Sequence, residues 1–284
     1  MTTANVRRLG IGTVQFGQAY GISNSAGQVT RDEVAAILSR AARAGIGLLD
    51  TAANYGEAET VLSQMDIGAF RKVTKTAKLS LGLDHVLARA RQSVKALGGV
   101  DLLLVHAAGD LAGADGAALW KALRDLKASG EVGGIGISAY VAEDPAALAQ
   151  HFRPDAMQVP FSLLDQRLLH DGSLQRLKAL GVEVHVRSLF LQGLLFMEQV
   201  PPKLSDAGPP LARTRARIAE AGTTPLAAAL AYVLSRPEVD VAVVGVTAER
   251  QLEEIVSAVT APQVELDRKA CALNDVRLLT PSLW

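Results

Sequence analysis

The chain has almost no cysteine: Cys271 is the only one in 284 residues. A single cysteine excludes an internal disulfide and any metal site built from several cysteines. Proteins without disulfides are typical of reducing compartments. We therefore expect a cytoplasmic protein.

The chain also lacks a surplus of either charge and lacks long apolar runs. Its 29 basic side chains balance 29 acidic ones, whereas proteins that bind nucleic acids or membrane surfaces usually carry a basic patch. No run of about 18 apolar residues is present, and residues 1–8 have no long apolar core that would indicate a signal peptide. We expect no nucleic-acid partner and no membrane association, and the sequence names no protein partner.

Eight short apolar segments alternate with helical patterns along most of the chain. Strands are predicted at 8–14, 46–50, 72–75, 100–105, 133–137, 156–159, 181–186 and 239–244. Helices are predicted at 30–44, 56–64, 83–97, 115–129, 144–150, 172–180, 211–221, 224–235 and 248–259, with a proline-containing irregular stretch before 211. Thr30 and Glu33 have the spacing of a capping box at the start of the first of these helices.

Nearly all-apolar strands separated by helices indicate a parallel sheet covered by helices. Eight such pairs predict an α/β fold, a closed (β/α)₈ TIM barrel. No linker or shift in composition divides the chain, so residues 1–284 are predicted to form a single domain. The alternative is an open doubly wound sheet, which is disfavoured because no Gly-x-Gly-x-x-Gly motif follows the first strand.

Ionisable side chains stand at the ends of three successive predicted strands. Asp50 ends the second, Lys75 the third and His106 the fourth, and Tyr55 follows just beyond the second. Taken singly, each residue has an ordinary role in a turn, in packing or at a solvated strand end. In a barrel, however, catalytic groups gather at the C-terminal ends of the strands. The pattern therefore predicts an acid–base site with Tyr55 as proton donor.

Around these residues the sequence resembles the aldo-keto reductase family, from about Leu9 to Ala258. The motifs that carry the resemblance are Gly10-Ile11-Gly12-Thr13, Leu49 to Gly56 with Glu59, Thr74-Lys75, Asp101 to His106 with Asp110, Trp120, Gly130, Gly136-Ile137-Ser138, Gln158 and Gly245. The resemblance implies a barrel that binds a nicotinamide cofactor without a Rossmann fold. It also implies hydride transfer between that cofactor and a small carbonyl compound.

The resemblance assigns a role to each member of the predicted site. Tyr55 is the general acid. Lys75 favours the ionised form of the Tyr55 phenol, and Asp50 pairs with Lys75. His106 orients and polarises the carbonyl group. Lys78 is the alternative to Lys75, which is preferred because it directly follows Thr74. No metal ion is expected.

The implied cofactor is NADP(H) or NAD(H). The positions assigned to it are Gly12, Thr13, Ser138, Gln158, Arg187, Ser188, Leu189, Gln192, Gly193, Gly245, Val246, Thr247, Gln251 and Glu254. Arg187 stands where relatives often have an aromatic side chain that stacks on the nicotinamide, although a surface arginine is an alternative interpretation. Residues 245 and 251, often basic in relatives that prefer the phosphorylated cofactor, are neutral here, so the preference stays open.

Phe16 and Tyr20 are predicted to line the substrate pocket, with packing of their own loop as the alternative; Trp284 is a further candidate. The resulting prediction is an NAD(P)H-dependent reductase of a small aldehyde, ketone or sugar-like carbonyl. The main alternative is a cofactor-bound redox-sensing regulatory protein with little turnover. A metal-dependent hydrolase using His106 and Asp50 is weaker, because the histidines that such sites favour are not clustered.

Overall fold

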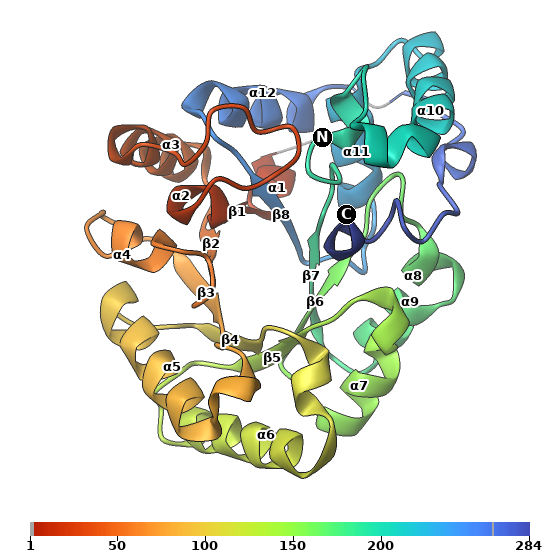
Figure 1. Ribbon diagram of the computed structural model, residues 1–284. Helices are drawn as coiled ribbons and strands as arrows, with labels where there is room; N and C mark the ends of the chain where they lie inside the picture. Colours follow the sequence, from red (N-terminus) through yellow and green to blue (C-terminus); the bar gives the residue numbers. More distant parts are fainter. Residues whose placement is uncertain (1–2, 263) are drawn as a thin grey trace.

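The computed structural model describes residues 3–262 and 264–284 and forms one closed barrel of eight parallel strands. The strands follow the order of the chain around the barrel, and β1 closes it by pairing with both β2 and β8 (Figure 1). Their bounds are β1 Leu9–Gly12, β2 Leu48–Asp50, β3 Arg71–Lys75, β4 Leu102–Val105, β5 Ile135–Ser138, β6 Ala156–Pro160, β7 Glu183–Arg187 and β8 Val241–Gly245. The predicted (β/α)₈ barrel is confirmed, and the open sheet is excluded.

Helices form the outer layer around the strands (Figure 1). They are α1 Thr3–Val6, α2 Val14–Gly17, α3 Arg31–Ala44, α4 Ala58–Leu62, α5 Leu83–Leu97, α6 Gly113–Ala128, α7 Pro145–Phe152, α8 Arg167–His170, α9 Ser173–Ala179, α10 Gly208–Glu220, α11 Pro225–Leu234 and α12 Glu249–Thr260. The nine predicted helices are all present. The short helices α1, α2 and α8 were not predicted, because four residues span too little of a helical period to produce a pattern. Within the described part of the chain, no helix is long and apolar enough to cross a membrane.

Two details of the helix ends correct the sequence analysis. Thr30 does cap α3 by accepting a hydrogen bond from the backbone nitrogen of Glu33, but the carboxylate of Glu33 accepts from the backbone nitrogen of Glu249. The reciprocal half of the predicted capping box is therefore replaced by a contact with α12. Helix α10 begins at Gly208 and not at 211, since its first turn accommodates Pro209 and Pro210.

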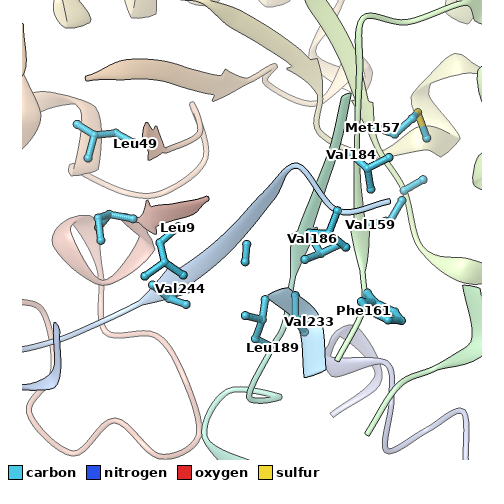
Figure 2. Packing of buried hydrophobic residues seen from close by; sticks show 14 of the residues in the cluster. Leu9, Leu49, Met157, Val159, Phe161, Val184, Val186, Leu189, Val233 and Val244 are labelled. Carbon is cyan, nitrogen blue, oxygen red and sulfur yellow. The ribbon is translucent and has the colours of Figure 1, made fainter. Parts of the chain in front are cut away.

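Side chains alternate between the two faces of each strand. Leu49, Val184 and Val186 belong to the main core between the strands and the helices (Figure 2). Their neighbours on the same strands point into the barrel, where Leu48 lies in a second apolar cluster with residues of β3, β4, β6 and β8. This alternation also points Asp50, next along β2, into the barrel at its C-terminal end.

An ion pair crosses the N-terminal end of the barrel. The guanidinium of Arg71, at the start of β3, donates to both carboxylate oxygens of Glu183, at the start of β7, at 3.0 and 3.1 Å. The hydrogen bond with His185 and the pairing with Arg71 lower the pKa of Glu183 to about 2 against the effect of burial. These side chains are hydrogen-bonded to one another. The polar side chains that remain available for catalysis lie at the opposite, C-terminal end of the barrel.

Candidate active site

A buried ion pair lies at the C-terminal end of β2 and β3. Lys75 Nζ donates to Asp50 Oδ2 at 2.7 Å, and the two side chains are 1% and 5% exposed. The other carboxylate oxygen, Asp50 Oδ1, accepts from Gln158 Nε2 at 2.7 Å. Both oxygens are thus held from different strands, which fixes the orientation of the carboxylate.

Lys75 is a cation in this environment. Burial, the largest influence, opposes its charge, but the attraction of Asp50 and Tyr55 and the hydrogen bonds to both outweigh burial, so the pKa of Lys75 lies above its ordinary value. Its ammonium also donates to the carbonyl oxygen of Thr51 at 2.9 Å. All three ammonium donors therefore have partners within the protein.

Tyr55 stands beside this ammonium. Its hydroxyl oxygen lies 3.3 Å from Lys75 Nζ, and its ring packs edge-to-face with the ring of His106 at 5.7 Å between centroids. The sequence-predicted residues Asp50, Tyr55, Lys75 and His106 are thus brought together by β2, β3, β4 and the loops that follow them. Lys78, the alternative lysine, is exposed in the next loop and has no hydrogen bond to Tyr55 among the contacts of the described residues.

His106 is neutral near physiological pH. Burial, followed by repulsion from Lys75, lowers its pKa to about 4. Its backbone nitrogen donates to Thr76 Oγ1 at 3.2 Å, and its ring Nδ1 is buried without a hydrogen-bond partner in the described residues. A neutral imidazole offers one N–H donor, which suits it to polarise a carbonyl oxygen without carrying a charge.

Close backbone contacts position the loop that carries Tyr55. A side chain at Gly17 would collide with the backbone of Tyr55 and Ala58, and Gly56 approaches Gly17 from the other side with a φ of +54°. The backbone nitrogen of Glu57 donates to the carbonyl oxygen of Gly17 at 3.2 Å. Glycine at position 17 is therefore a condition for the observed path of this loop.

A polar network under the same loop ties α4 to β3 and α5. The buried carboxylate of Glu59 accepts hydrogen bonds from Thr74, Arg89 and Ser93, and Arg89 also reaches the carbonyl oxygen of Ala53 at 3.4 Å. Sequence reasoning missed Gly17, Arg89 and Ser93. No local signal distinguishes Arg89 and Ser93 from other polar residues of an amphipathic helix, because their partners come from other segments.

Three predicted cofactor residues lie on the successive strands β5, β6 and β7, two of them at the strand ends and Gln158 in the middle of β6. Ser138 closes β5 and is paired in register with Gln158 on β6. Arg187 closes β7, where its guanidinium carbon lies 4.2 Å from the centre of the Tyr140 ring. On the other side of the rim, Thr13 donates to the carbonyl oxygen of Asp50 at 3.1 Å, next to Gly12 at the end of β1.

The loop after β7 is locally strained and is tied across the barrel mouth. Ser188 and Gln192 have φ angles of +63° and +54°, a region that non-glycine residues rarely adopt. Gln192 accepts from the backbone nitrogen of Ile22 at 3.2 Å and donates to the hydroxyl of Tyr20 at 3.2 Å. At Gly193 a side chain would collide with Ser23. Two sequence-predicted groups, Gln192 of the cofactor set and Tyr20 of the pocket, therefore touch.

The start of α12 is occupied by protein groups. Gln251 Oε1 accepts from the backbone nitrogen of Thr247 at 2.8 Å, and Glu33 accepts from the backbone nitrogen of Glu249. The predicted adenine partner Glu254 is held by Arg250 at 3.1 Å. Glu33 was assigned by the sequence to its own helix, so its place at this end of α12 is a new finding.

Burial corrects part of the predicted ligand set. Phe16 has no exposed surface and lies in the main core, so it packs beneath its loop and does not line the pocket. The side chains of Leu189 and Val246 are buried in the same core, which leaves only their backbone for a ligand. Tyr20 is 39% exposed. Partial burial, followed by the neighbouring Tyr55 and Tyr140, raises its pKa against the opposing effect of Arg187.

The polar groups at the rim fit an amide-bearing ligand. Gln15 Oε1 and Thr51 Oγ1 are buried without hydrogen-bond partners in the described residues, and a side chain at Gly245 would run into Gln15. The amide nitrogen of Gln158 donates a hydrogen bond to Asp50. The side-chain carbonyl oxygen of Gln158 therefore remains available as an acceptor beside Ser138. In contrast, no group of three or more potential metal ligands is found in the described residues.

Comparison with known proteins gives the same fold and one family. Residues 8–272 match the model of the aldo/keto reductase family. An L-galactose dehydrogenase of Arabidopsis thaliana is 30% identical over 92% of this chain and 89% of its own length. An uncharacterized oxidoreductase of Mycobacterium tuberculosis is 29% identical over 89% of this chain and 84% of its own length.

Two solved structures share the fold at lower identity. Aldo-keto reductase AKR11C1 from Bacillus halodurans, in its holo form, superposes with a TM-score of 0.72 at 19% identity, covering 98% of this chain and 93% of that chain. A putative aldo-keto reductase from Pseudomonas aeruginosa superposes with a TM-score of 0.63 at 22% identity, covering 89% of each chain.

Proposed function

The chain belongs to the aldo/keto reductase family, and on that premise we propose that it reduces a small aldehyde, ketone or sugar-like carbonyl with a nicotinamide cofactor, using Tyr55 as the general acid. The observation that carries the proposal is the arrangement around Lys75. One buried ammonium is 2.7 Å from a carboxylate and 3.3 Å from a phenol. This arrangement is suited to proton transfer at the phenol.

The reduction needs a hydride on the carbonyl carbon and a proton on the carbonyl oxygen. A bound nicotinamide supplies the hydride. Tyr55 gives its hydroxyl proton to the oxygen, and the ammonium of Lys75 stabilises the negative charge left on the phenol oxygen until solvent returns a proton. Neutral His106 donates its N–H to the same carbonyl oxygen and orients it.

Asp50 acts through Lys75. Because Asp50 and Thr51 hold the ammonium in place, it does not reorganise as charge develops on the phenol oxygen. Ser138 and the carbonyl oxygen of Gln158 are the groups proposed to hold the nicotinamide carboxamide. The 245–251 segment is proposed to hold the adenosine half.

The name of one relative supports the sugar-like substrate. The Arabidopsis protein is named for oxidation of a sugar, and oxidation of an alcohol is the reverse of the reaction proposed here. A sugar in its open-chain form presents an aldehyde or ketone with neighbouring hydroxyl groups. Tyr20 and Tyr140 at the rim offer hydroxyl partners for such a chain.

The proposal is tested by following the oxidation of NADH and of NADPH with purified, metal-free protein and a panel of aldehydes, ketones and open-chain sugars. We expect oxidation that requires the carbonyl compound. Very slow turnover across the whole panel, combined with cofactor-dependent capture of a protein partner, would instead favour the redox-sensing alternative.

We further propose that the enzyme prefers NADH, because a carboxylate already occupies the start of α12. A helix N-terminus attracts anions, but Glu33 takes the backbone N–H of Glu249 there and repels a second negative group. The Glu33→Gln variant keeps an acceptor for this N–H and removes the charge. We expect NADPH affinity to rise about tenfold relative to NADH, equivalent to about 1.4 kcal/mol.

Fluorescence titration with each cofactor measures this effect. Glu253→Gln is the matched control. Glu253 lies on α12 itself, but its carboxylate pairs with Arg40 at 3.5 Å and has no hydrogen bond to the start of the helix in the described part of the chain. An unchanged ratio of the two dissociation constants in Glu33→Gln would refute the role of Glu33.

A further inference from the structure

Arg187 faces the reaction end of the barrel. It is the last residue of β7, and Val186 before it points outward to pack with Val159 and Leu189 (Figure 2). Side chains alternate along a strand, so Arg187 shares the inner face with Glu183 and His185. Glu183 closes the far end of the barrel, whereas Arg187 reaches the rim that holds Tyr55 and His106.

The guanidinium of Arg187 is positioned but has no ionic partner. One face lies on the Tyr140 ring at 4.2 Å. Its only hydrogen bonds among the described residues are two long ones of 3.5 Å, to Ser188 Oγ and the carbonyl oxygen of Ala139. No carboxylate within the described residues forms an ion pair with it, in contrast to Arg71, Arg89 and Arg167. Tyr140 therefore orients the planar guanidinium of Arg187, whose N–H donors remain available for another acceptor.

Positive side chains outnumber negative ones among the neighbours that shift the pKa of His106. Lys75, Arg187 and Lys78 lower this pKa, whereas Asp50 raises it. A half-buried cation that lacks a counter-charge is costly unless a ligand supplies one. The site is therefore electrostatically suited to an anion bound next to the reacting carbonyl group.

The anion belongs to the carbonyl compound. The positive charge of Arg187 favours a lower pKa for both His106 and Tyr20, which lie where the carbonyl substrate is proposed to bind. The adenosine half of the cofactor is proposed to bind at the start of α12, which follows β8. Substrate and guanidinium therefore share one side of the site.

We propose that the substrate carries an oxyanion, a carboxylate or a phosphate, close to its carbonyl group, and that Arg187 binds this oxyanion. The inference rests on the reductase function proposed above. An Arg–oxyanion pair with two parallel hydrogen bonds fixes both distance and orientation. The substrate class is thus an acidic aldehyde or ketone, such as an aldehyde acid or a sugar phosphate in its open form.

Two matched pairs of substrates test the proposal. Succinic semialdehyde differs from butanal in its carboxylate, and glyceraldehyde phosphate differs from glyceraldehyde in its phosphate. We expect the wild-type protein to favour at least one anionic member by about 10- to 100-fold in kcat/KM, mainly through KM, as a charged hydrogen-bonded contact would give. The pair that shows the preference identifies the oxyanion.

Variants assign the preference to Arg187. In Arg187→Met the ratio between anionic and neutral substrates is expected to fall close to one, and in Arg187→Lys to an intermediate value. NADH affinity, measured by fluorescence titration, is expected to stay unchanged in both. Lys78→Met removes an equal charge from an exposed position on the same rim and is expected to retain most of the preference. Thermal melting of each variant verifies that it is folded.

The outcomes separate this inference from the proposed function. Absence of turnover with all four compounds and with the wider carbonyl panel removes the proposed function and this inference with it. Turnover without a preference for the anionic members overturns the inference alone. An equal loss of preference in Lys78→Met also overturns the inference, because that result indicates an effect of the overall positive charge at the rim and not direct binding by Arg187. Weakened NADH binding in Arg187→Met with the preference intact assigns Arg187 to the nicotinamide instead.

Discussion

Tyr55→Phe is expected to lower kcat by about 10²- to 10⁴-fold, the range typical of a positioned general acid. The substitution removes only the hydroxyl that lies 3.3 Å from Lys75 Nζ. A phenylalanine ring retains the edge-to-face contact with His106. Folding and cofactor affinity are therefore expected to stay close to the wild-type values, which circular dichroism and fluorescence titration measure.

Tyr232→Phe is the matched control for this experiment. The Tyr232 hydroxyl is also buried, but its ring stacks on Phe161 in the core and contacts Arg236, and among the described residues it contacts no member of the proposed site. Its removal is expected to leave kcat nearly unchanged. Wild-type turnover in Tyr55→Phe would refute the assignment of Tyr55 as the acid, because no other group in the proposal supplies the proton.

Asp50→Asn is expected to lower the free energy of unfolding by about 3–5 kcal/mol and to reduce turnover strongly. The change leaves the ammonium of Lys75 buried, 1% exposed, without its carboxylate. Removal of one partner of a buried ion pair is costly because the remaining charge is desolvated and uncompensated. Urea denaturation measures the loss of stability.

Two further variants distinguish this cause from a general effect of losing a carboxylate. Asp125→Asn breaks an exposed pair with Lys121, whose side chains are 65% and 78% exposed, and is expected to cost less than about 1 kcal/mol. The double variant Asp50→Asn/Lys75→Met removes both charges and is expected to regain part of the stability without regaining activity. A single Asp50→Asn variant as stable as the wild type would contradict the expectation.

The fold and four of the site residues were predictable because their signals are local. Apolar runs and helical periodicity define the strands and helices. The last residue of each strand in the sequence therefore lies at the C-terminal end of the barrel. Asp50 and Lys75 close β2 and β3, His106 directly follows β4, and Tyr55 lies in the segment between β2 and α4. Once a parallel barrel is inferred, these side chains must meet at one rim. Their catalytic roles remain predictions.

Other parts of the site were not predictable, because they depend on contacts between distant segments. Glu33 looked like a capping residue of α3, yet it reaches Glu249, 216 positions away. Nothing local shows that Gly17 supports Tyr55, since the collision that requires glycine involves another loop. Phe16 looked like a pocket residue because a loop aromatic gives no sign of which side it faces.

The sequence by itself determined the barrel and the order in which Asp50, Tyr55, Lys75 and His106 arrive at its rim, because spacing along a strand fixes the direction of each side chain. Only the tertiary structure decided how these groups are held and balanced. It placed Gln158 on Asp50, Glu33 at the start of α12, and Arg187 on Tyr140 without an acidic partner among the described residues. Those contacts form only when barrel closure brings together strands and loops that the chain keeps far apart.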